Sequence, residues 1–313
     1  MRRLRLSTRR GGFALLIVIW GLGAIALLVA SFLSTGRLRL QTAFNLAGAA
    51  RAQSIAAAAI DIAILSLADE RLARGGPQGP APRDGAPSFC AIDDAVVAVA
   101  IEDESGKVDL NTASESLLRD MFAGFAELTP GAAGGLAQAV AAFRTPPEND
   151  LPPPPPSDGK PFGPKHAAFQ TVLELDQIAG MDGGTFHRLL PFVTVHSRSE
   201  GIDPHVAPPA LFAALVGMPP QEVARLAAAP FPNRLNRDDP RFPSAYRQAG
   251  AHGAFAIHVE VVLADGPSAA RESIVEMQSN DGAPFALREI RHGAARYLDD
   301  LRRMRGANDL PPC

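Results

Sequence analysis

The stretch "RRGGFALLIVIWGLGAIALLVASFL", residues 9–33, decides how this chain is organised. Arginines precede it, and no charged residue occurs between Arg10 and Arg37. A helix of about 20 residues spans roughly 30 Å, which is the thickness of the hydrocarbon core of a bilayer. The sequence therefore predicts a membrane-spanning helix over residues 13–34, with the basic N-terminus on the cytoplasmic side.

A cleaved secretory signal is the alternative interpretation of this stretch. Such a signal has an apolar core of about 7–15 residues before a small-x-small cleavage site. The apolar run here is longer, although "LVA" at residues 28–30 would permit cleavage near its end. Both interpretations place the rest of the chain beyond the cytoplasmic membrane.

The helical pattern continues past the membrane segment. Between Arg37 and Gly75 the one helix-breaking residue is Gly48. Apolar residues recur there mostly three or four positions apart, at Leu40, Phe44, Ala47, Ile55, Ala58, Ile62, Leu65 and Ala68. This spacing is typical of one face of an amphipathic helix, and alanine is the best helix former. We therefore predict one helix over residues 13–74, suited to packing against identical or related helices.

Composition disfavours a nucleic-acid-binding surface of the usual strongly basic kind. The chain has 313 residues and a formal net charge of −3 at pH 7. Its length exceeds that of an average domain, so an anchor and two modules are expected. The two cysteines, Cys90 and Cys313, can pair in an oxidising compartment, or Cys313 can be free.

The rest of the chain divides into strand-like and helical parts. A Gly/Pro-rich linker is predicted over residues 75–92. Apolar alternation predicts a sheet built from residues 93–110 and 251–292, with Phe255 and Ile257 on one side of a strand and His258 and Glu260 on the other. A helical domain, residues 111–230, is inserted into this head. Residues 293–313 are predicted to be a polar C-terminal tail, in which the alternative to irregular chain is a short helix that frays.

Two acidic groups are candidate cation sites. Asp93, Asp94, Glu102, Asp103 and Glu104 flank the first strand, where the alternative is a solvated turn. Glu148, Asp150 and Asp158 flank a run of five prolines, where the alternative is a solvated loop. Calcium prefers about six to eight oxygen ligands, which these side chains would supply in part. The sequence shows no Ser-His-Asp or Cys-His arrangement with a defensible spacing, so an enzyme is not expected.

The junction at residues 9–13, "RRGGF", resembles the processing site of type IV pilin-like proteins. The resemblance implies a leader of residues 1–12, cleavage by a prepilin peptidase between Gly12 and Phe13, and N-methylation of Phe13. Most members carry a glutamate five residues into the mature chain, where this chain has Ile17. The K-type minor pseudopilin of type II secretion systems also lacks that acid. A carboxylate in a bilayer is costly unless it is paired, and a subunit at the tip has no neighbour above it to serve.

Three further motifs follow in the order found in K-type minor pseudopilins: "VDLNTAS" at residues 108–114, "FQTVLEL" at 169–175 and "IDPHVAP" at 202–208. The same helix-hairpin-helix-like order occurs in competence DNA receptors. A DNA-binding hairpin presents turn amides to phosphate beside basic residues. Here the turn "GMDGG" at residues 180–184 contains an acid, and lysines and arginines are scattered. We interpret the hairpins as a scaffold; a membrane-tethered DNA-binding protein is the alternative.

The resemblance implies an α+β fold: a long transmembrane and amphipathic helix, then a pseudopilin-like antiparallel sheet with an inserted all-α helix-hairpin-helix-like (SAM-like) domain. It implies a non-enzymatic subunit that caps the type II secretion pseudopilus and helps initiate its assembly for export of folded proteins across the outer membrane. The implied partners are the I- and J-type minor pseudopilins, the major pseudopilin, the prepilin peptidase and the inner-membrane secretion platform. The implied location is the bacterial inner membrane, crossed once, with the C-terminal region in the periplasm. Some relatives bind calcium.

Overall fold

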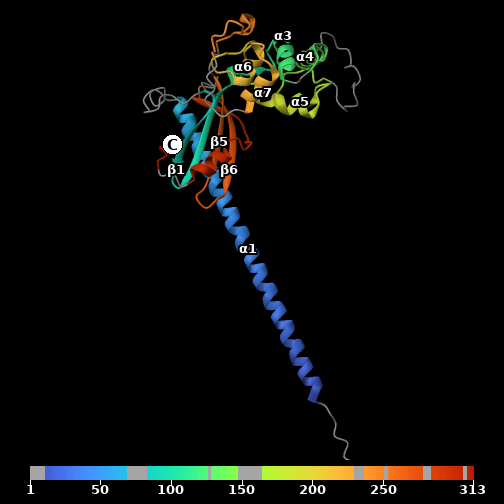
Figure 1. The fold of residues 1–313 in the computed structure, drawn as a ribbon, viewed down its shortest axis with the longest axis vertical. Coiled ribbons are helices and arrows are strands. Elements are labelled where there is room, and N and C mark those ends of the chain that lie inside the picture. The colour runs from blue at the N-terminus through green and yellow to red at the C-terminus, as the bar shows by residue number, and fades with distance from the viewer. Residues whose placement is uncertain are drawn as a thin grey trace, which may run out of the picture.

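A computed structural model describes residues 11–68, 83–125, 128–146, 164–228, 236–249, 253–277, 283–305 and 309–313. One long helix, α1 (Gly11–Ala68), forms a stem that carries a head made of a sheet and short helices (Figure 1). Residues 1–10 of the predicted leader and residues 69–74 of the predicted helix lie outside the described residues. The α+β class predicted from the sequence is confirmed.

The sheet has five antiparallel strands in the order β1-β2-β5-β6-β7. They are β1 (Asp84–Ile92), β2 (Ala95–Asp103), β5 (Ala254–Val262), β6 (Ser268–Met277) and β7 (Phe285–His292). The strands β2 and β5 are neighbours although the helical module separates them in sequence. The module is therefore an insertion between two adjacent strands.

The linker prediction is wrong from Asp84 onward, because these residues form β1. Gly85 has a φ of 84° and the pairing shifts between Asp84 and Pro87, so the strand begins with a bulge. Proline and glycine are tolerated here because β1 lies at an edge of the sheet. The Gly/Pro content that suggests a linker is thus the content of an irregular edge strand.

The upper part of α1 packs on one face of the sheet. Its buried residues are Ala52, Ala56, Ala59, Ile60, Ala63 and Ile64. They meet the side chains that β5 points toward the helix, including Phe255, Ile257 and Val259, as the alternation predicts. Small side chains let the helix approach closely: a Cβ added at Gly48 would lie 2.6 Å from Pro267 Cγ.

Most of the apolar stripe predicted from residue spacing faces away from the sheet, and of its members Ile55 packs against the core between α1 and the sheet. Leu40, Phe44 and Leu65 are 61–74% exposed, and Ile62 is 39% exposed. The buried face is made mainly of alanine, whose weak hydropathy hides it beside larger residues. Two different faces of α1 are therefore apolar, and the head covers one of them.

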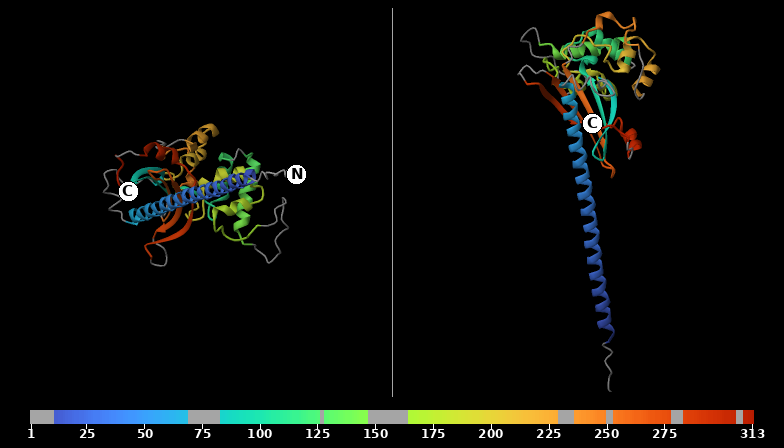
Figure 2. Two further views of the ribbon diagram at one scale, coloured as in Figure 1. Left: turned by 90° about the horizontal axis from the view of Figure 1, so that it is seen from below. Right: turned by 90° about the vertical axis from the view of Figure 1, so that its left-hand side faces the viewer.

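The helical module lies between β2 and β5 in the sequence, and it has a core of its own. Its elements are η1 (Glu104–Gly106), β3 (Val108–Asp109), α3 (Glu115–Phe125), α4 (Pro130–Arg144), η2 (Val172–Gln177), α5 (Gly183–Leu189), η3 (Leu190–Phe192), β4 (Val193–Thr194), α6 (Pro209–Leu215), α7 (Pro220–Ala228) and η4 (Ser244–Tyr246). The fully buried side chains include Leu118, Phe122, Phe143 and Phe212. Figures 1 and 2 show this module at the end of the sheet away from the free part of α1.

Two similar loops start the two halves of the module. In "DLNTA" the guanidinium of Arg144 donates to the carbonyls of Leu110 and Ala113, at 2.8 and 2.7 Å. In "DPHVA" the guanidinium of Arg237 donates to Ala207 O at 2.7 Å and to Pro204 O at 3.3 Å. Each arginine satisfies carbonyls that no helix or strand pairs, so the motifs quoted above are explained by loop structure.

The turn that follows β2 meets the loop before α6 through a close backbone contact at Gly106. A Cβ there would lie 2.5 Å from Val206 O, which is backbone and cannot swing away. We expect Gly106→Ala to lower the free energy of unfolding by about 1–3 kcal/mol through overpacking. The control is Gly134→Ala in α4, where nothing lies within 4 Å; that change should be neutral or stabilising. Urea denaturation that gives equal midpoints for both variants would contradict the contact.

The C-terminal residues contain the short helix that was predicted for them, but this helix packs on the sheet instead of fraying. Helix α8 (Leu298–Met304) buries Leu301 fully against Val96, Ala98 and Val262, on the sheet face opposite α1. Beyond it Cys313 forms a disulfide with Cys90, with a Cα–Cα distance of 5.0 Å. The single buried leucine and the terminal cysteine are too few to stand out in a charged sequence.

The disulfide joins residues 223 positions apart. We expect the double variant Cys90→Ser, Cys313→Ser to unfold about 2–4 kcal/mol more easily, because the cross-link restricts the unfolded chain. Urea denaturation with and without reductant measures this. Reductant should shift the wild-type midpoint and leave the double variant unchanged; an unchanged wild type would contradict the cross-link.

Candidate functional site

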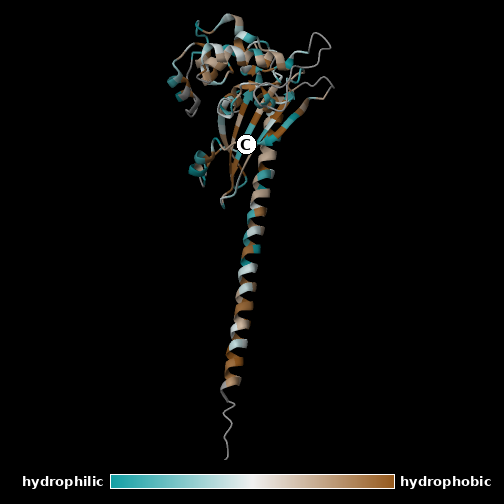
Figure 3. Cartoon of the chain, turned by 90° about the vertical axis from the view of Figure 1, so that its right-hand side faces the viewer, coloured by the Kyte–Doolittle hydropathy of each residue, from teal (hydrophilic) through white to brown (hydrophobic). Residues whose placement is uncertain are grey.

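The free part of α1 is a long exposed apolar surface. Its large apolar side chains from Phe13 to Leu46 are 53–79% exposed. Figure 3 shows hydrophobic residues recurring along this length. Among the described residues, α1 is the one helix long and apolar enough to cross a membrane. Exposed surface of this size marks a membrane or protein contact.

The proposed cleavage junction lies at the start of this helix. Gly12 is in the first turn of α1, and the Phe13 ring is 74% exposed. The arginines before Gly11 lie outside the described residues. The junction stays a prediction from the sequence.

A second apolar surface follows α1 up into the head. We call it the exposed stripe: Leu40, Phe44, Ala47, Ala58, Ile62 and Leu65, all exposed. At about 100° per residue these positions fall on one side of the helix, and the alanine face that packs on the sheet falls on another. The stripe is continuous with the free part of the helix, so both could meet one neighbouring helix.

In the hairpin turn that resembles a DNA-binding motif, the turn amides are already bonded to a side chain of the same turn. Asp182 Oδ1 accepts hydrogen bonds from the amides of Gly184 and Thr185, at 2.8 and 3.0 Å. Hydrogen bonds from the Thr185 side chain and backbone lower the pKa of Asp182, so the turn holds a carboxylate. A DNA phosphate would have to displace this negative charge from the same amides.

The acidic residues that are candidates for a cation site differ in their contacts and burial. Asp93 and Asp94 bind the guanidinium of Arg51, at 2.8 and 2.6 Å. The interpretation of Glu102, Asp103 and Glu104 as a solvated turn is wrong, because Asp103 and Glu104 are buried and Glu102 binds the buried Lys107. The other candidates, Glu148, Asp150 and Asp158, lie outside the described residues. Within the described ranges no cluster of three His, Cys, Asp or Glu side chains is arranged to hold a metal ion.

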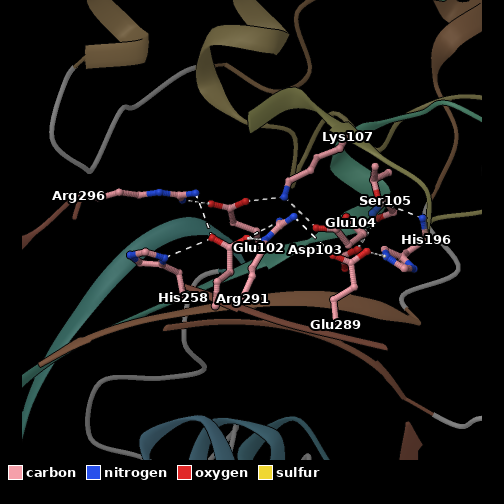
Figure 4. A network of polar contacts seen from close by, with 12 residues as sticks. Glu102, Asp103, Glu104, Ser105, Lys107, His196, His258, Glu289, Arg291 and Arg296 are labelled. Carbon is pink, nitrogen blue, oxygen red and sulfur yellow. Dashed lines mark hydrogen bonds and ion pairs between the residues drawn. The ribbon is translucent and has the colours of Figure 1, made fainter. Parts of the chain in front are cut away.

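A buried ion cluster joins the sheet, the module and the C-terminal segment. Its members are Glu102, Glu104, Lys107, His258, Glu260, Glu272, Arg291 and Arg296. Lys107 Nζ lies 2.6 Å from Glu102 and 2.8 Å from Glu104 (Figure 4). Arg296 extends the cluster from Glu102, at 2.7 Å, to Glu272, at 3.4 Å. Because these residues come from β2, β5, β6, β7 and the chain after β7, the cluster ties all of them together.

His258 lies at the centre of one half of the cluster. Its Nε2 is 2.9 Å from Glu260 Oε1, and its Nδ1 is 3.4 Å from Glu272 Oε2. Arg291 also contacts Glu272. The guanidinium of Arg291 lies 3.6 Å from the Glu289 carboxylate, and that carboxylate lies 3.0 Å from His196 Nε2. The imidazole is almost fully buried.

Burial and paired charges act in opposite directions on the carboxylates of the cluster. Burial opposes ionisation of Glu102, but Lys107 and Arg296 outweigh it and lower its pKa to about 2. Burial likewise opposes ionisation of Glu272, and His258, Arg291 and Arg296 lower its pKa well below the usual range. Burial raises the pKa of Tyr297 to about 12. Glu102 and Glu272 are therefore charged at neutral pH.

The sequence patterns did not predict this cluster. His258 and Glu260 were expected on the polar side of their strand, and that side is buried. Their neighbour Glu272 stands directly across from His258 on β6. The signal that could have found the site is a pair of polar residues at alternate positions of a strand that is otherwise apolar.

The fold resembles that of chains in solved structures. A chain of the crystal structure of the GspK–GspI–GspJ complex from the type 2 secretion system of enterotoxigenic Escherichia coli aligns with a TM-score of 0.51 and 16% identity, covering 83% of this chain and 99% of that chain. At this identity the likeness establishes the fold. No protein-family model matches the sequence, and a search of curated proteins finds no match.

Proposed function

We propose that this chain is a K-type minor pseudopilin: a subunit that caps the tip of a type II secretion pseudopilus and helps to start its assembly. The observation that carries the proposal is the exposed helix. Apolar side chains run uncovered from Phe13 along the stem to Leu65, past the point where the head begins. A simple membrane anchor needs only about 20 apolar residues.

The exposed stripe is suited to a neighbouring helix. The head already covers the alanine face of α1, so a second helix would meet Leu40, Phe44, Ile62 and Leu65. Helices associate through such apolar stripes, with residues three and four apart interdigitating. I- and J-type minor pseudopilins, and the major pseudopilin, are the partners we propose.

The helical module supports a position at the tip. It lies beyond the end of the sheet, opposite the part of α1 that would enter the membrane (Figure 1). A further subunit stacked above would meet the module before it met α1. The absence of an acid at Ile17 agrees with this place, because no subunit above offers an amine for it to pair with.

The disulfide agrees with a head outside the cytoplasm. Disulfides persist in oxidising compartments such as the periplasm, and Cys90 pairs with Cys313 here. We propose that the chain crosses the inner membrane once, that the prepilin peptidase removes residues 1–12, and that the head lies in the periplasm beside the secretion platform. The role is structural, as a folded cap that other subunits assemble beneath.

Association with sibling subunits tests the proposal. The full-length chain would be produced in detergent with the I- and J-type minor pseudopilins of the same secretion system, and complexes would be captured through a tag on a sibling. We expect a stable complex with the wild type. Ile62→Lys, Leu65→Lys should reduce its yield at least about tenfold, because two charges replace the exposed stripe.

The matched control is Gln53→Lys. Gln53 is exposed and lies nine positions before Ile62, about two and a half turns away and so on the other side of the helix. This variant should assemble like the wild type. No complex with the wild type, or equal loss in both variants, would contradict the proposed role of the stripe.

A further inference from the structure

We propose that residues 293–305 form a pH-sensitive strap, held on the sheet by the protonated ring of His258 and loosened when that ring loses its proton. The strap follows β7, crosses the sheet face opposite α1 and ends with α8. This inference concerns the head alone and does not depend on the proposed function.

One carboxylate oxygen connects the histidine to the strap. Glu260 Oε1 accepts hydrogen bonds from the backbone amides of Arg296 and Tyr297, the second at 2.9 Å. The same oxygen lies 2.9 Å from His258 Nε2. The position of the Glu260 carboxylate therefore depends on His258, and the start of α8 depends on Glu260.

The geometry around His258 favours the imidazolium over the neutral ring. Both ring nitrogens face carboxylate oxygens, one from Glu260 and one from Glu272. A neutral imidazole has one N–H donor, so its other nitrogen would point a lone pair at a carboxylate. The ring has no room to turn away, because Gly293 packs on it so closely that a Cβ there would lie 2.7 Å from His258 Cε1.

The balance of charges in the cluster also favours a protonated His258. It contains four carboxylates, Glu102, Glu104, Glu260 and Glu272, against three permanent cations, Lys107, Arg291 and Arg296. His258 supplies the fourth positive charge. Its loss would leave a buried negative charge in excess, and Glu260 Oε2 is already buried with no hydrogen-bond partner within the described residues.

Charged and titratable groups reach His258 from every element around it. Glu260 on its own strand and Glu272 on β6 contact the ring, and Tyr297 on the strap packs against it. Arg291 on β7 and Arg296 on the strap bind Glu272. Arg296 also binds Glu102, which in turn binds Lys107. The Tyr297 ring stands edge-on to the imidazole with 5.9 Å between centroids. Glu289 and His196 lie further out, beyond Arg291, and are more exposed.

The direction of the pH effect follows from these contacts. Burial lowers the pKa of His258, but hydrogen bonds to Glu260 and Glu272 outweigh it, so the pKa is raised above the ordinary value of about 6.5. A group with a raised folded-state pKa stabilises the fold fully below its unfolded pKa and loses this contribution as the pH rises through the folded pKa. The strap should therefore hold near about pH 6 and loosen as the pH rises through the raised pKa of His258. The disulfide at Cys313 keeps its far end attached.

Hydrogen exchange tests the strap. The full-length protein in detergent micelles would be labelled between pH 6 and pH 9, with rates corrected for the intrinsic pH dependence of exchange, and read by mass spectrometry. We expect protection of residues 293–305 to fall by up to about tenfold for each unit of pH above the raised pKa. Protection of β5 should change much less.

Three variants identify the group responsible. His258→Gln should expose the strap equally at every pH. Glu260→Gln should flatten the pH profile, because the cluster then balances without the imidazolium; this second variant decides the matter if the first does not fold. His187→Gln, at an exposed histidine of α5, should keep the wild-type profile. A wild-type strap with no pH dependence, or an unchanged profile in His258→Gln or Glu260→Gln, would overturn the inference.

Discussion

Ala56→Asp is expected to unfold the head. Ala56 is fully buried between α1 and the sheet, among apolar side chains such as Ile257 and Val259. An aspartate there would bury a carboxylate without a partner and push the helix from the strands. We expect a loss of about 4 kcal/mol or more, which is most of the stability of an ordinary domain.

The matched control for this change is Ser54→Asp. Ser54 is exposed on the same helix two residues earlier, so the new charge meets water. Its effect should stay within about 0.5 kcal/mol. The measurement is urea denaturation followed by circular dichroism. Equal stability of the two variants would show that α1 does not pack on the sheet as described.

Glu272→Leu is expected to have the second largest effect. Glu272 accepts from Arg291, Arg296 and His258, and its side chain is buried. Its removal leaves two guanidinium groups and an imidazolium facing one another without the central carboxylate. We expect a loss of about 3 kcal/mol, since removing one partner of a buried ion pair leaves an uncompensated charge.

Glu289→Leu serves as the control for Glu272→Leu. Glu289 is the more exposed acid beside the same Arg291, and its contacts are looser. Its loss should cost about 1 kcal/mol or less. Denaturation midpoints measure both, and a larger effect at Glu289 would place the energetic centre of the cluster outside Glu272.

The carboxylates of the same cluster predict how the stability of the fold depends on pH in acid. Burial opposes ionisation of Glu102, and cations lower its pKa to about 2. A lowered folded-state pKa means that the stabilisation is present above the unfolded pKa, about 4.3, and is lost as the pH falls through the folded pKa. We expect wild-type stability to fall below about pH 4, and Glu272→Leu to show a shallower fall because one of the lowered groups is gone.

Local patterns were enough to predict the main elements of the fold. The long helix follows from apolar composition and the lack of proline, and the alternation of Phe255, Ile257 and Val259 shows that these side chains share one apolar face of β5. Both are properties of neighbouring residues, so a single sequence contains them. The stripe of large residues on α1 was also visible, but a periodic apolar face does not tell what covers it.

The ion cluster could not be predicted in the same way. Three segments that contribute to it are brought together only by the tertiary structure: the stretch with Glu102 and Lys107, the strand with Glu272, and the chain around Arg296. Read alone, "EDESGK" after β2 has the composition of a solvated turn. Its burial depends on cations up to 194 positions away, and nothing in the local sequence records that distance.

The central claim is that the apolar stem belongs to a processed pilin-like subunit. The most direct measurement is mass spectrometry of the N-terminus of the full-length protein, produced with and without an active prepilin peptidase. The account predicts a chain that begins at N-methylated Phe13 when the peptidase is active, and an uncut leader when it is not. An intact Met1 in both samples, or a new N-terminus near Ser31, would contradict it.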